Sequence, residues 1–376
     1  MKWEYKTLDQ LGTVSRGKSK HRPRNDPKLF GGKYPFIQTA DVKNADYYIT
    51  KYSDTYNESG LAQSKLWDKG TLCITIAANI ADTGVLAFPA CFPDSIMGFV
   101  PFEGVANTRF IKYCFDRLQR DCKQISQGTA QDNLSWEKLS TIKFCIPEYK
   151  EQCRIADILS AYDDLIENNQ KQIKLLEEAA QRLYKEWFVD LNFPGHENTK
   201  IVDGVPEEWR RGLLKELISV NYGKDHKKVP DDGNIPVYGS GGLMRKCNKS
   251  LFSGEAVLIP RKGSLNNIMY VDETFWTVDT MFYATMKQPH TAVFVYFFVK
   301  AFDMYSMNIG AAVPSMTAKI LDAMDVVVPD KETLEKFDKY AKVYFNKIKT
   351  LQGQNERLET ARDLLLPKLM SGEVEV

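Results

Sequence analysis

The feature that most constrains the fold of this 376-residue chain is an internal repeat. Residues 127–135 (Gln-Gly-Thr-Ala-Gln-Asp-Asn-Leu-Ser) align with residues 309–317 at an offset of 182. The same offset aligns residues 139–147 with residues 321–329, and both are short apolar segments that end in proline. The register continues without a gap to Phe188 and Met370. Such self-similarity predicts two copies of one structural scaffold.

The beginnings of the two halves also match, but at other offsets. At an offset of 206 the sequence aligns Trp3, Leu8, Leu11, Gly17 and Lys18 with Trp209, Leu214, Leu217, Gly223 and Lys224. Residues 34–37 resemble residues 234–238, at an offset near 201. The middle of each half therefore differs in length while its edges agree, which indicates a common scaffold with a diverged insert.

Each copy ends in a long segment with apolar residues spaced alternately by four and three positions, a heptad pattern that predicts a long helix. Each predicted helix is about 35 residues, or about 50 Å, long. We expect the two helices to pack on each other antiparallel; the alternative is that each packs on its own globular half. Asn169 and Asn355 occupy seam positions, and Pro367 is expected to interrupt the second helix. The predicted seam residues are Ile155, Leu159, Tyr162, Ile166, Ile173, Leu176, Leu183, Phe337, Tyr344, Ile348, Leu351, Leu358 and Leu365.

The globular segments are rich in short β-type runs separated by turn dipeptides. They predict an α+β fold with strongly bent, mostly antiparallel sheets. The internal repeat predicts a pseudo-two-fold arrangement of the two copies. The predicted domains are a first globular domain (1–147), a first long helix (148–191), a linker (192–206), a second globular domain (207–329) and a second long helix (330–376).

Charge distribution and cysteine content indicate the cellular compartment and the kinds of partner to expect. The net charge is +1, but Lys and Arg outnumber Asp and Glu by 20 to 15 in residues 1–147 and are outnumbered by 11 to 6 in residues 148–199. This asymmetry suggests surfaces with different partners. The 7 cysteines are scattered without a Cys-x-x-Cys pair, which indicates free thiols in a reducing cytoplasm. The apolar run at residues 291–301 is too short for a membrane span and predicts a buried strand or helix.

Three motifs suggest catalysis or nucleotide binding, and each fails in its context. Residues 12–19 satisfy the phosphate-loop pattern, but a polar segment precedes them and prolines follow, so no strand and helix flank the loop. An adenine methyltransferase would need an Asn/Asp-Pro-Pro-aromatic loop, and residues 192–195 lack the paired prolines. Pro93-Asp94 with residues 121–123 matches a nuclease pattern only loosely. We therefore predict a non-enzymatic chain with no catalytic, cofactor-binding or metal-binding residues.

Binding chemistry is better represented. A basic run lies beside turn residues and suits contact with phosphates. Its members are Arg16, Lys18, Lys20, His21, Arg22 and Arg24. A solvated loop is the alternative. Polar side chains that can pair with base edges lie on predicted loops; a glycine-enabled turn is the structural alternative for each loop. These candidate base-contacting residues are Gln38, Thr39, Asp41, Gln127, Thr129, Gln131, Tyr238, Ser240, Arg261, Lys262 and Ser264.

Over essentially its whole length the chain resembles the specificity subunits of type I restriction–modification enzymes. The order of the segments and the 182-residue register carry the resemblance, rather than any single motif. One departure is residues 335–338, Glu-Lys-Phe-Asp, where the first helix begins with a Gln-x-x-Ile pattern. The matching segments are residues 34–42 (Tyr-Pro-Phe-Ile-Gln-Thr-Ala-Asp-Val), the loop at Gly128, residues 152–156, 163–166, 235–242, 259–264 and 364–372.

The resemblance implies a DNA-binding subunit that recognises a bipartite target, one half-site per recognition domain, with the helices as a spacer. Its partners would be double-stranded DNA, two methyltransferase (modification) subunits and restriction–translocase subunits. The sites for S-adenosylmethionine and for ATP with Mg²⁺ would lie in those partners. Two alternatives remain: a DNA-modifying enzyme that acts alone, and a coiled-coil scaffold that does not bind DNA.

Overall fold

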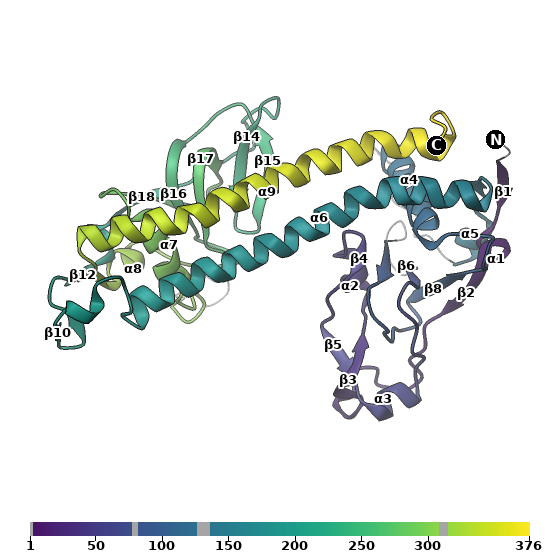
Figure 1. Cartoon of the computed structure of the whole chain (residues 1–376), viewed down its shortest axis with the longest axis horizontal. Coiled ribbons are helices and arrows are strands. Elements are labelled where there is room, and N and C mark those ends of the chain that lie inside the picture. The colour runs from purple at the N-terminus through teal and green to yellow at the C-terminus, as the bar shows by residue number, and fades with distance from the viewer. Residues whose placement is uncertain (1–2, 77–81, 126–135, 308–314) are drawn as a thin grey trace. The chain divides into compact units, whose positions relative to one another are not determined.

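The computed structural model describes residues 3–76, 82–125, 136–307 and 315–376 (Figure 1). The chain forms two compact units, each described here by itself. Unit 1 comprises Met1–Asn169 with Gly353–Val376, and unit 2 comprises Gln170–Gln352. Each long helix thus contributes one part to each unit, whereas the domain scheme from the sequence treats the helices as segments of their own.

Unit 1 is built on a five-stranded sheet with the strand order β2-β8-β6-β7-β4. The pair β4–β7 is parallel and the other neighbours are antiparallel. Two two-stranded antiparallel sheets, β3-β5 and β1-β9, accompany it. The strands are β1 (Glu4–Lys6), β2 (Gly12–Arg16), β3 (Phe30–Phe36), β4 (Tyr48–Ile49), β5 (Asp54–Tyr56), β6 (Leu72–Thr75), β7 (Thr83–Leu86), β8 (Ile96–Pro101) and β9 (Phe144–Ile146).

The helices of unit 1 close its core. Leu72 and Phe99 of the sheet, Phe110 of α4, Leu159 of α6 and Leu369 of α9 belong to one buried cluster, so both long helices complete this core. The helices are α1 (Leu8–Leu11), the 3₁₀ turn η1 (Pro27–Leu29), α2 (Thr39–Lys43), α3 (Glu58–Ala62), α4 (Thr108–Ile125), α5 (Trp136–Thr141), and the parts of α6 (Tyr149–Tyr184) and α9 (Lys331–Ser371) that lie in this unit.

Unit 2 carries a six-stranded sheet with the order β13-β18-β16-β17-β14-β15 and the small pairs β12-β19 and β10-β11. Its strands are β10 (Ile201–Val202), β11 (Val205–Pro206), β12 (Arg210–Leu213), β13 (Ile218–Tyr222), β14 (Ile235–Gly239), β15 (Gly242–Cys247), β16 (Phe252–Pro260), β17 (Met269–Thr277), β18 (Met281–Met286) and β19 (Asp325–Val328). Its helices are the π-helical turn η2 (Lys185–Val189), the 3₁₀ turns η3 (His196–Asn198) and η4 (Leu214–Glu216), α7 (Ala292–Lys300) and α8 (Ala318–Asp322).

The sheet of unit 2 is strongly bent, and its register shows why. Phe252, at one end of the 9-residue strand β16, pairs with Phe275, and Pro260, at the other end, pairs with Met281. A straight strand of that length spans nearly 30 Å. The chain from Thr277 to Met281 reaches only about 14 Å, so the sheet must curl to bring the two ends together. Bent, mostly antiparallel sheets were predicted from the sequence, and this α+β prediction is confirmed.

The two units repeat the same elements in the same order. The orders β2-β8-β6-β7 and β13-β18-β16-β17 are equivalent, and each is followed by a strand that pairs in parallel, β4 on β7 and β14 on β17. The pairs β1-β9 and β12-β19 are also equivalent, and each precedes a long helix. The inserts differ, since unit 1 has α2, β4, β5 and α3 where unit 2 has the β14–β15 hairpin.

The Gly-Lys pair shared by both copies marks a close approach of backbones. The Gly17 amide donates to the Ile96 carbonyl at 2.9 Å, and the Gly223 amide donates to the Met281 carbonyl at 3.0 Å. A Cβ atom on Gly17 would lie 2.2 Å from the Phe92 carbonyl oxygen, and one on Gly223 would lie 2.0 Å from that of Val278. The apparent phosphate-loop motif is thus strand β2 and the glycine that follows it.

The long helices pack against each other antiparallel inside each unit (Figure 1). In unit 1 the Asn169 amide donates to the Asn355 side-chain oxygen at 2.8 Å, and Arg362 pairs with Asp163. In unit 2 the Trp187 ring lies 5.8 Å from the Phe337 ring. Every predicted seam residue is buried or half-buried. The helices also complete the globular cores, so the two packing modes that were considered as alternatives both occur.

Pro367 does not interrupt the second helix, contrary to the prediction. Helix α9 continues through Pro367 to Ser371. A proline cannot donate to the carbonyl four residues earlier, here that of Asp363. The Arg120 guanidinium of α4 donates to this carbonyl at 3.1 Å and pairs with the Asp363 carboxylate. A side chain from another element therefore satisfies the backbone group that the proline leaves free.

The buried asparagine pair supports a stability prediction. Asn169→Leu leaves the Asn355 amide buried without its partner, and we expect a loss of roughly 1–3 kcal/mol in the free energy of unfolding. Asn169→Leu/Asn355→Leu removes both polar groups and is expected to recover most of that loss. Urea denaturation of the two variants measures the difference. Equal destabilisation by the single and double changes would contradict a role for the amide–amide bond.

The apolar run at residues 291–301 is confirmed as a buried element, since it contains helix α7, whose residues Ala292–Phe297 are all buried. In the part of the chain that the structure describes, no helix combines the length and apolar character needed to cross a membrane.

Candidate nucleic-acid interface

In unit 1 the predicted basic run forms a loop, residues 16–24, that leaves the end of β2. Its backbone is fixed from outside the loop. The Ser64 hydroxyl donates to the Lys18 carbonyl at 2.7 Å, and the His21 amide donates to the Gln63 side-chain oxygen at 3.0 Å. Ser19 is buried between exposed Lys18 and Lys20. The side chains of Lys18 and Lys20 are therefore exposed to solvent on a loop whose backbone is fixed by hydrogen bonds.

The five lysine and arginine side chains of this loop divide into two kinds. Arg22 donates to the carbonyls of Ser19 and His21, and Arg24 pairs with Asp94 at 2.7 Å. Among the described residues, Arg16, Lys18 and Lys20 form no ion pair, and all three are exposed. Arg22 and Arg24 thus shape the loop, while the other three are available for phosphate contact.

The residues Gln38, Thr39 and Asp41 lie at the start of helix α2. The Gln38 amide donates to Asp41 Oδ2 at 2.8 Å, and the Ser53 hydroxyl donates to Asp41 Oδ1 at 3.0 Å. The Gln38 side-chain amide donates to Asp54 at 2.6 Å. Both oxygens of Asp41 are therefore used inside this loop, as expected of a helix-capping residue. Gln38 stays exposed and Thr39 is half-buried.

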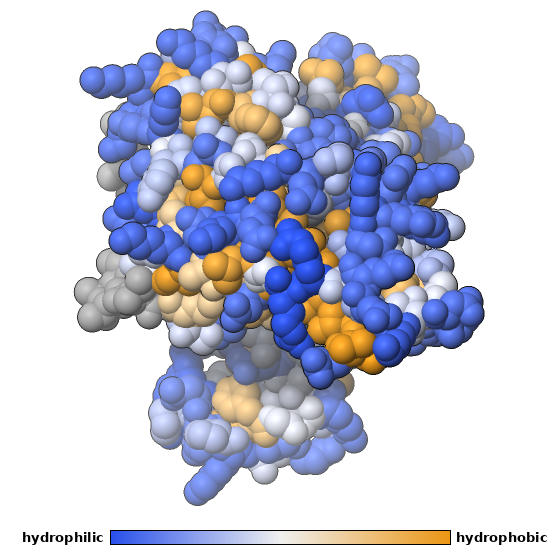
Figure 2. Space-filling model, turned by 90° about the vertical axis from the view of Figure 1, so that its left-hand side faces the viewer, coloured by the Kyte–Doolittle hydropathy of each residue, from blue (hydrophilic) through white to orange (hydrophobic). Residues whose placement is uncertain are grey.

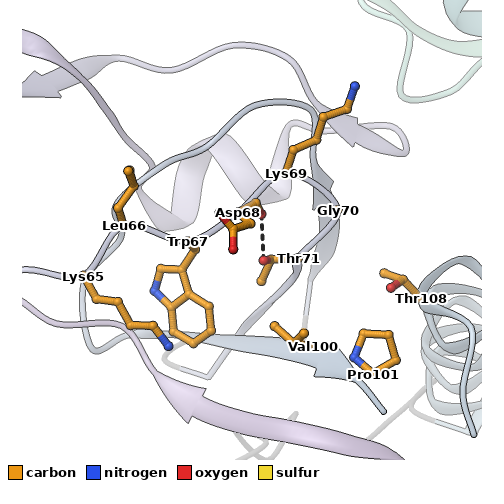
Figure 3. A pocket seen from close by; sticks show the side chains of 10 residues that line it. All are labelled: Lys65, Leu66, Trp67, Asp68, Lys69, Gly70, Thr71, Val100, Pro101 and Thr108. Atoms are coloured by element: carbon orange, nitrogen blue, oxygen red, sulfur yellow. Dashed lines mark hydrogen bonds between the residues drawn. The ribbon is translucent and has the colours of Figure 1, made fainter. Parts of the chain in front are cut away.

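A pocket of about 340 Å³ lies between the segment before β6 and the end of β8 (Figure 3). The Lys65 ammonium lies 3.5 Å from the centre of the Trp67 ring, and the Thr71 hydroxyl donates to the Asp68 carbonyl at 2.7 Å. These groups are engaged within the segment itself, so we assign no ligand to the pocket. Lys65 adds a cation next to Ser64, which anchors the basic loop.

In unit 2 four chain segments gather at one end of the bent sheet. The Lys224 amide donates to the Thr277 carbonyl at 2.9 Å, and the Val278 amide donates to the Tyr238 carbonyl at 3.0 Å. The Arg261 amide donates to the Thr280 carbonyl at 2.8 Å. We call residues 222–229, 238–242, 261–264 and 277–281 the unit 2 loop cluster. It contains every candidate base-contacting residue that the sequence places in the second half.

These candidates differ in how free they are. Ser240 and Arg261 are half-buried, whereas Lys262 and Ser264 are exposed. The Arg261 guanidinium lies 5.6 Å from the centre of the exposed Tyr222 ring and donates to the Asp279 carbonyl at 3.3 Å. The Tyr238 hydroxyl donates to Glu273 at 2.5 Å, which fixes this side chain to β17.

Sequence inspection missed the counterpart of the first basic loop in unit 2. Lys224, Lys227 and Lys228 follow β13 as the first basic loop follows β2, and all three are exposed. The signal was present, because Gly223-Lys224 already aligns with Gly17-Lys18. The candidates Gln127, Thr129 and Gln131 lie outside the described residues.

The chemistry of these two surfaces suits a nucleic acid, which carries phosphates and presents the hydrogen-bonding edges of its bases. Exposed ammonium and guanidinium groups favour phosphates. Arginine, lysine and serine donors can pair with base edges. The two surfaces occupy equivalent places in the two units, after β2 and after β13, but they carry different side chains.

Comparison with known proteins agrees with this architecture. The family model of the type I restriction modification DNA specificity domain matches residues 1–178 and 206–360. The type I restriction enzyme MjaIX specificity subunit of Methanocaldococcus jannaschii is 25% identical, over 100% of this chain and 94% of that protein. The HindI specificity subunit of Haemophilus influenzae is 22% identical, over 64% of this chain and 71% of that protein.

A solved structure shares the fold. The crystal structure of a type I restriction–modification system S subunit from M. genitalium matches with a TM-score of 0.62 at 19% sequence identity. The match covers 98% of this chain and 96% of that one.

Proposed function

Because this chain belongs to the type I restriction–modification DNA specificity family, we propose that it recognises the DNA target of such a complex through one half-site per unit. The observation that carries the proposal is the repeated position of a basic surface on two units with the same strand order. A repeated scaffold with different loop residues suits a target made of two different half-sites.

Helices α6 and α9 would serve as the spacer between the two recognition surfaces. Helix α6 has 36 residues, and a straight helix of that length spans about 54 Å. This is about one and a half turns of DNA at ~34 Å per turn. A target with two specified half-sites and an unspecified spacer follows from such an arrangement.

The repeat also suggests how partners assemble. Two equivalent scaffolds offer two equivalent docking places, so we propose that two methyltransferase subunits bind one copy of this chain. Restriction–translocase subunits would join that complex. The S-adenosylmethionine site and the ATP and Mg²⁺ sites belong to those partners in this proposal, and this chain supplies recognition without catalytic groups. The free thiols of Cys73, Cys91, Cys114, Cys145, Cys153 and Cys247 suit a reducing cytoplasm.

Methylation mapping tests the proposal most directly. The chain is co-expressed with its cognate modification subunit, and methylated adenines are located across the host genome. We expect one bipartite motif whose two halves differ in sequence. The isolated chain, assayed for methyl transfer, is expected to be inactive. Robust methylation by the isolated chain, or a complex that binds DNA without sequence preference, would overturn the proposal.

Arg261 supports a half-site prediction. Its guanidinium is held at the centre of the unit 2 loop cluster by Asp279 and Tyr222. We expect Arg261→Ala to weaken binding of the target duplex roughly tenfold. The variant should lose discrimination against base changes in one half-site and keep it in the other. Competition binding with duplexes altered in either half-site measures this. Equal loss at both half-sites would identify Arg261 as a phosphate-contacting or structural residue.

A further inference from the structure

The β14–β15 hairpin of unit 2 carries two apolar side chains where its sequence neighbours are basic. Leu243 is 56% exposed and Met244 is 54% exposed. Arg245, Lys246 and Lys249 follow them. Exposed apolar residues also occur elsewhere on unit 2, for example Val202 and Phe302. Small apolar patches lie among polar residues on the face of the protein drawn in Figure 2. Exposure of an apolar side chain therefore does not by itself indicate a binding site. The chemistry of the residues around Leu243 and Met244 is needed as well.

The hairpin is tied to the unit 2 loop cluster. The Asn267 side-chain amide donates to the Ser240 carbonyl at 2.9 Å, next to the loop of Arg261. The Arg245 guanidinium donates to the carbonyls of His226 at 2.5 Å and Val229 at 2.9 Å, in the segment that carries the exposed lysines Lys227 and Lys228. The hairpin thus lies against the segment that carries the exposed Lys227 and Lys228, together with the exposed Asp225, Asp231 and Asp232.

The hairpin backbone and the Met244 side chain are also held in place. The hairpin turns at Gly242, whose φ of 112° is a conformation open to glycine. A Cβ atom on Gly239 would lie 2.4 Å from the Met244 sulfur, so Met244 occupies the space over Gly239. Tyr238, the partner of Leu243 in the ladder, is fixed by its hydroxyl to Glu273. The hairpin backbone and the Met244 side chain are therefore positioned before a ligand arrives, which lowers the entropy cost of binding.

On DNA, exposed apolar side chains can contact the apolar groups of the major groove. In the major groove each base pair presents donors and acceptors, and the 5-methyl group of thymine is the apolar group among them. We propose that Leu243 and Met244 contact thymine methyl groups in the half-site recognised by unit 2. This inference rests on the proposed function and names residues that would give that half-site a preference for A·T pairs. Unit 1 carries the insert α2, β4, β5 and α3 in place of this hairpin, so we expect the contact in one half-site only.

Replacement of thymine by uracil tests the inference, because it removes only the methyl group. The assembled complex with its modification subunit is used, on duplexes of the mapped target in which each thymine of both half-sites is replaced in turn. At one or two positions of a single half-site we expect uracil to weaken binding about fourfold, the worth of one buried methyl group. For Leu243→Ala/Met244→Ala we expect weaker binding of the thymine duplex and no further loss with uracil.

Ile201→Ala provides a matched control, since Ile201 is 48% exposed on β10, away from the loop cluster in the chain. This variant should respond to uracil as the unchanged complex does. If the complex binds its mapped target specifically and uracil has the same effect with and without the hairpin change, the inference is wrong and the proposed function stands. A unit 2 half-site that contains no A·T pair would also overturn it. Loss of sequence preference altogether would instead contradict the proposed function.

Discussion

Arg362→Met is expected to destabilise unit 1 by roughly 3–5 kcal/mol near neutral pH, because it leaves the buried Asp163 carboxylate without its cation. Asp163 is 4% exposed and accepts hydrogen bonds from Arg362 and, at 2.5 Å, from the Tyr113 hydroxyl. The hydroxyl alone does not balance a full charge. Urea denaturation of the unchanged chain and the variant measures the loss.

The same variant should show a distinctive dependence on pH. Burial already raises the pKa of Asp163, while Arg362 and the Tyr113 hydroxyl act to lower it. Without Arg362 that pKa rises further. A carboxyl group with a higher pKa in the folded state takes up a proton on folding, so stability increases as the pH falls through that folded-state pKa. We therefore expect the deficit of Arg362→Met to shrink as the pH is lowered toward ~5.

Two controls isolate the buried charge. Asp163→Asn/Arg362→Met removes the charge as well as its partner and is expected to recover most of the stability at neutral pH. Arg154→Met removes an arginine of α6 whose side chain is 52% exposed and should change stability by less than about 0.5 kcal/mol. Additive losses from the Asp163 and Arg362 changes would show that the two residues act independently.

The heptad periodicity predicted which residues lie in the seam between the two helices, but not that an ion pair is buried there. Every residue chosen from the heptad pattern is buried or half-buried, because helical spacing places such residues on one face whatever their partners are. At the offset of 182, Asp163 aligns with Phe345 and Arg362 with Ala180. One copy thus carries an ion pair where the other carries apolar side chains. That difference depends on Tyr113, a residue of α4 that no pattern along the helix contains.

Tertiary compensation explains the wrong expectation about Pro367. The sequence correctly signals a missing backbone donor, but the group that replaces it is Arg120, far away in the chain.

The departure at residues 335–338 from the pattern of the first helix has a similar cause. Gln152 ties the start of α6 to the Val105 carbonyl, and in unit 2 Asp338 of α9 pairs with His290 at 2.8 Å instead. Different side chains make the same kind of connection between a long helix and the segment before α4 or α7.

The candidate site was only partly predictable, because a loop residue that caps a helix and one that contacts a base look alike in sequence. Asp41 uses both carboxylate oxygens within its own loop. Arg261, by contrast, is brought beside Tyr222 and Thr280 by strand pairing between distant segments. The exposed pair Leu243 and Met244 could not be singled out, since exposure of an apolar side chain depends on which strand is at the edge of the sheet.

The largest expected effect on DNA binding comes from the first basic loop. Arg16→Ala/Lys18→Ala/Lys20→Ala removes the three exposed cations of this loop, which have no ion pair among the described residues. Each phosphate contact releases about 0.9 of a counterion, worth about fivefold in affinity at ~0.15 M salt, so three contacts give about 100-fold. We expect that loss for the target duplex and for an unrelated duplex alike. The slope of log affinity against log salt concentration should fall by about 3.

The uniformity of the loss distinguishes phosphate contact from base recognition. A cation that binds phosphate contributes equally on every sequence, so the ratio of target to non-target affinity should stay unchanged. Lys18→Arg/Lys20→Arg keeps the charge and should keep the salt slope. Lys143→Ala/Lys150→Ala removes two exposed lysines outside the loop and should leave affinity unaltered. A loss confined to one half-site, with the slope unchanged, would assign the loop to base contact. No loss at all would make it a solvated turn, and recognition by unit 1 would then have to rest on other residues.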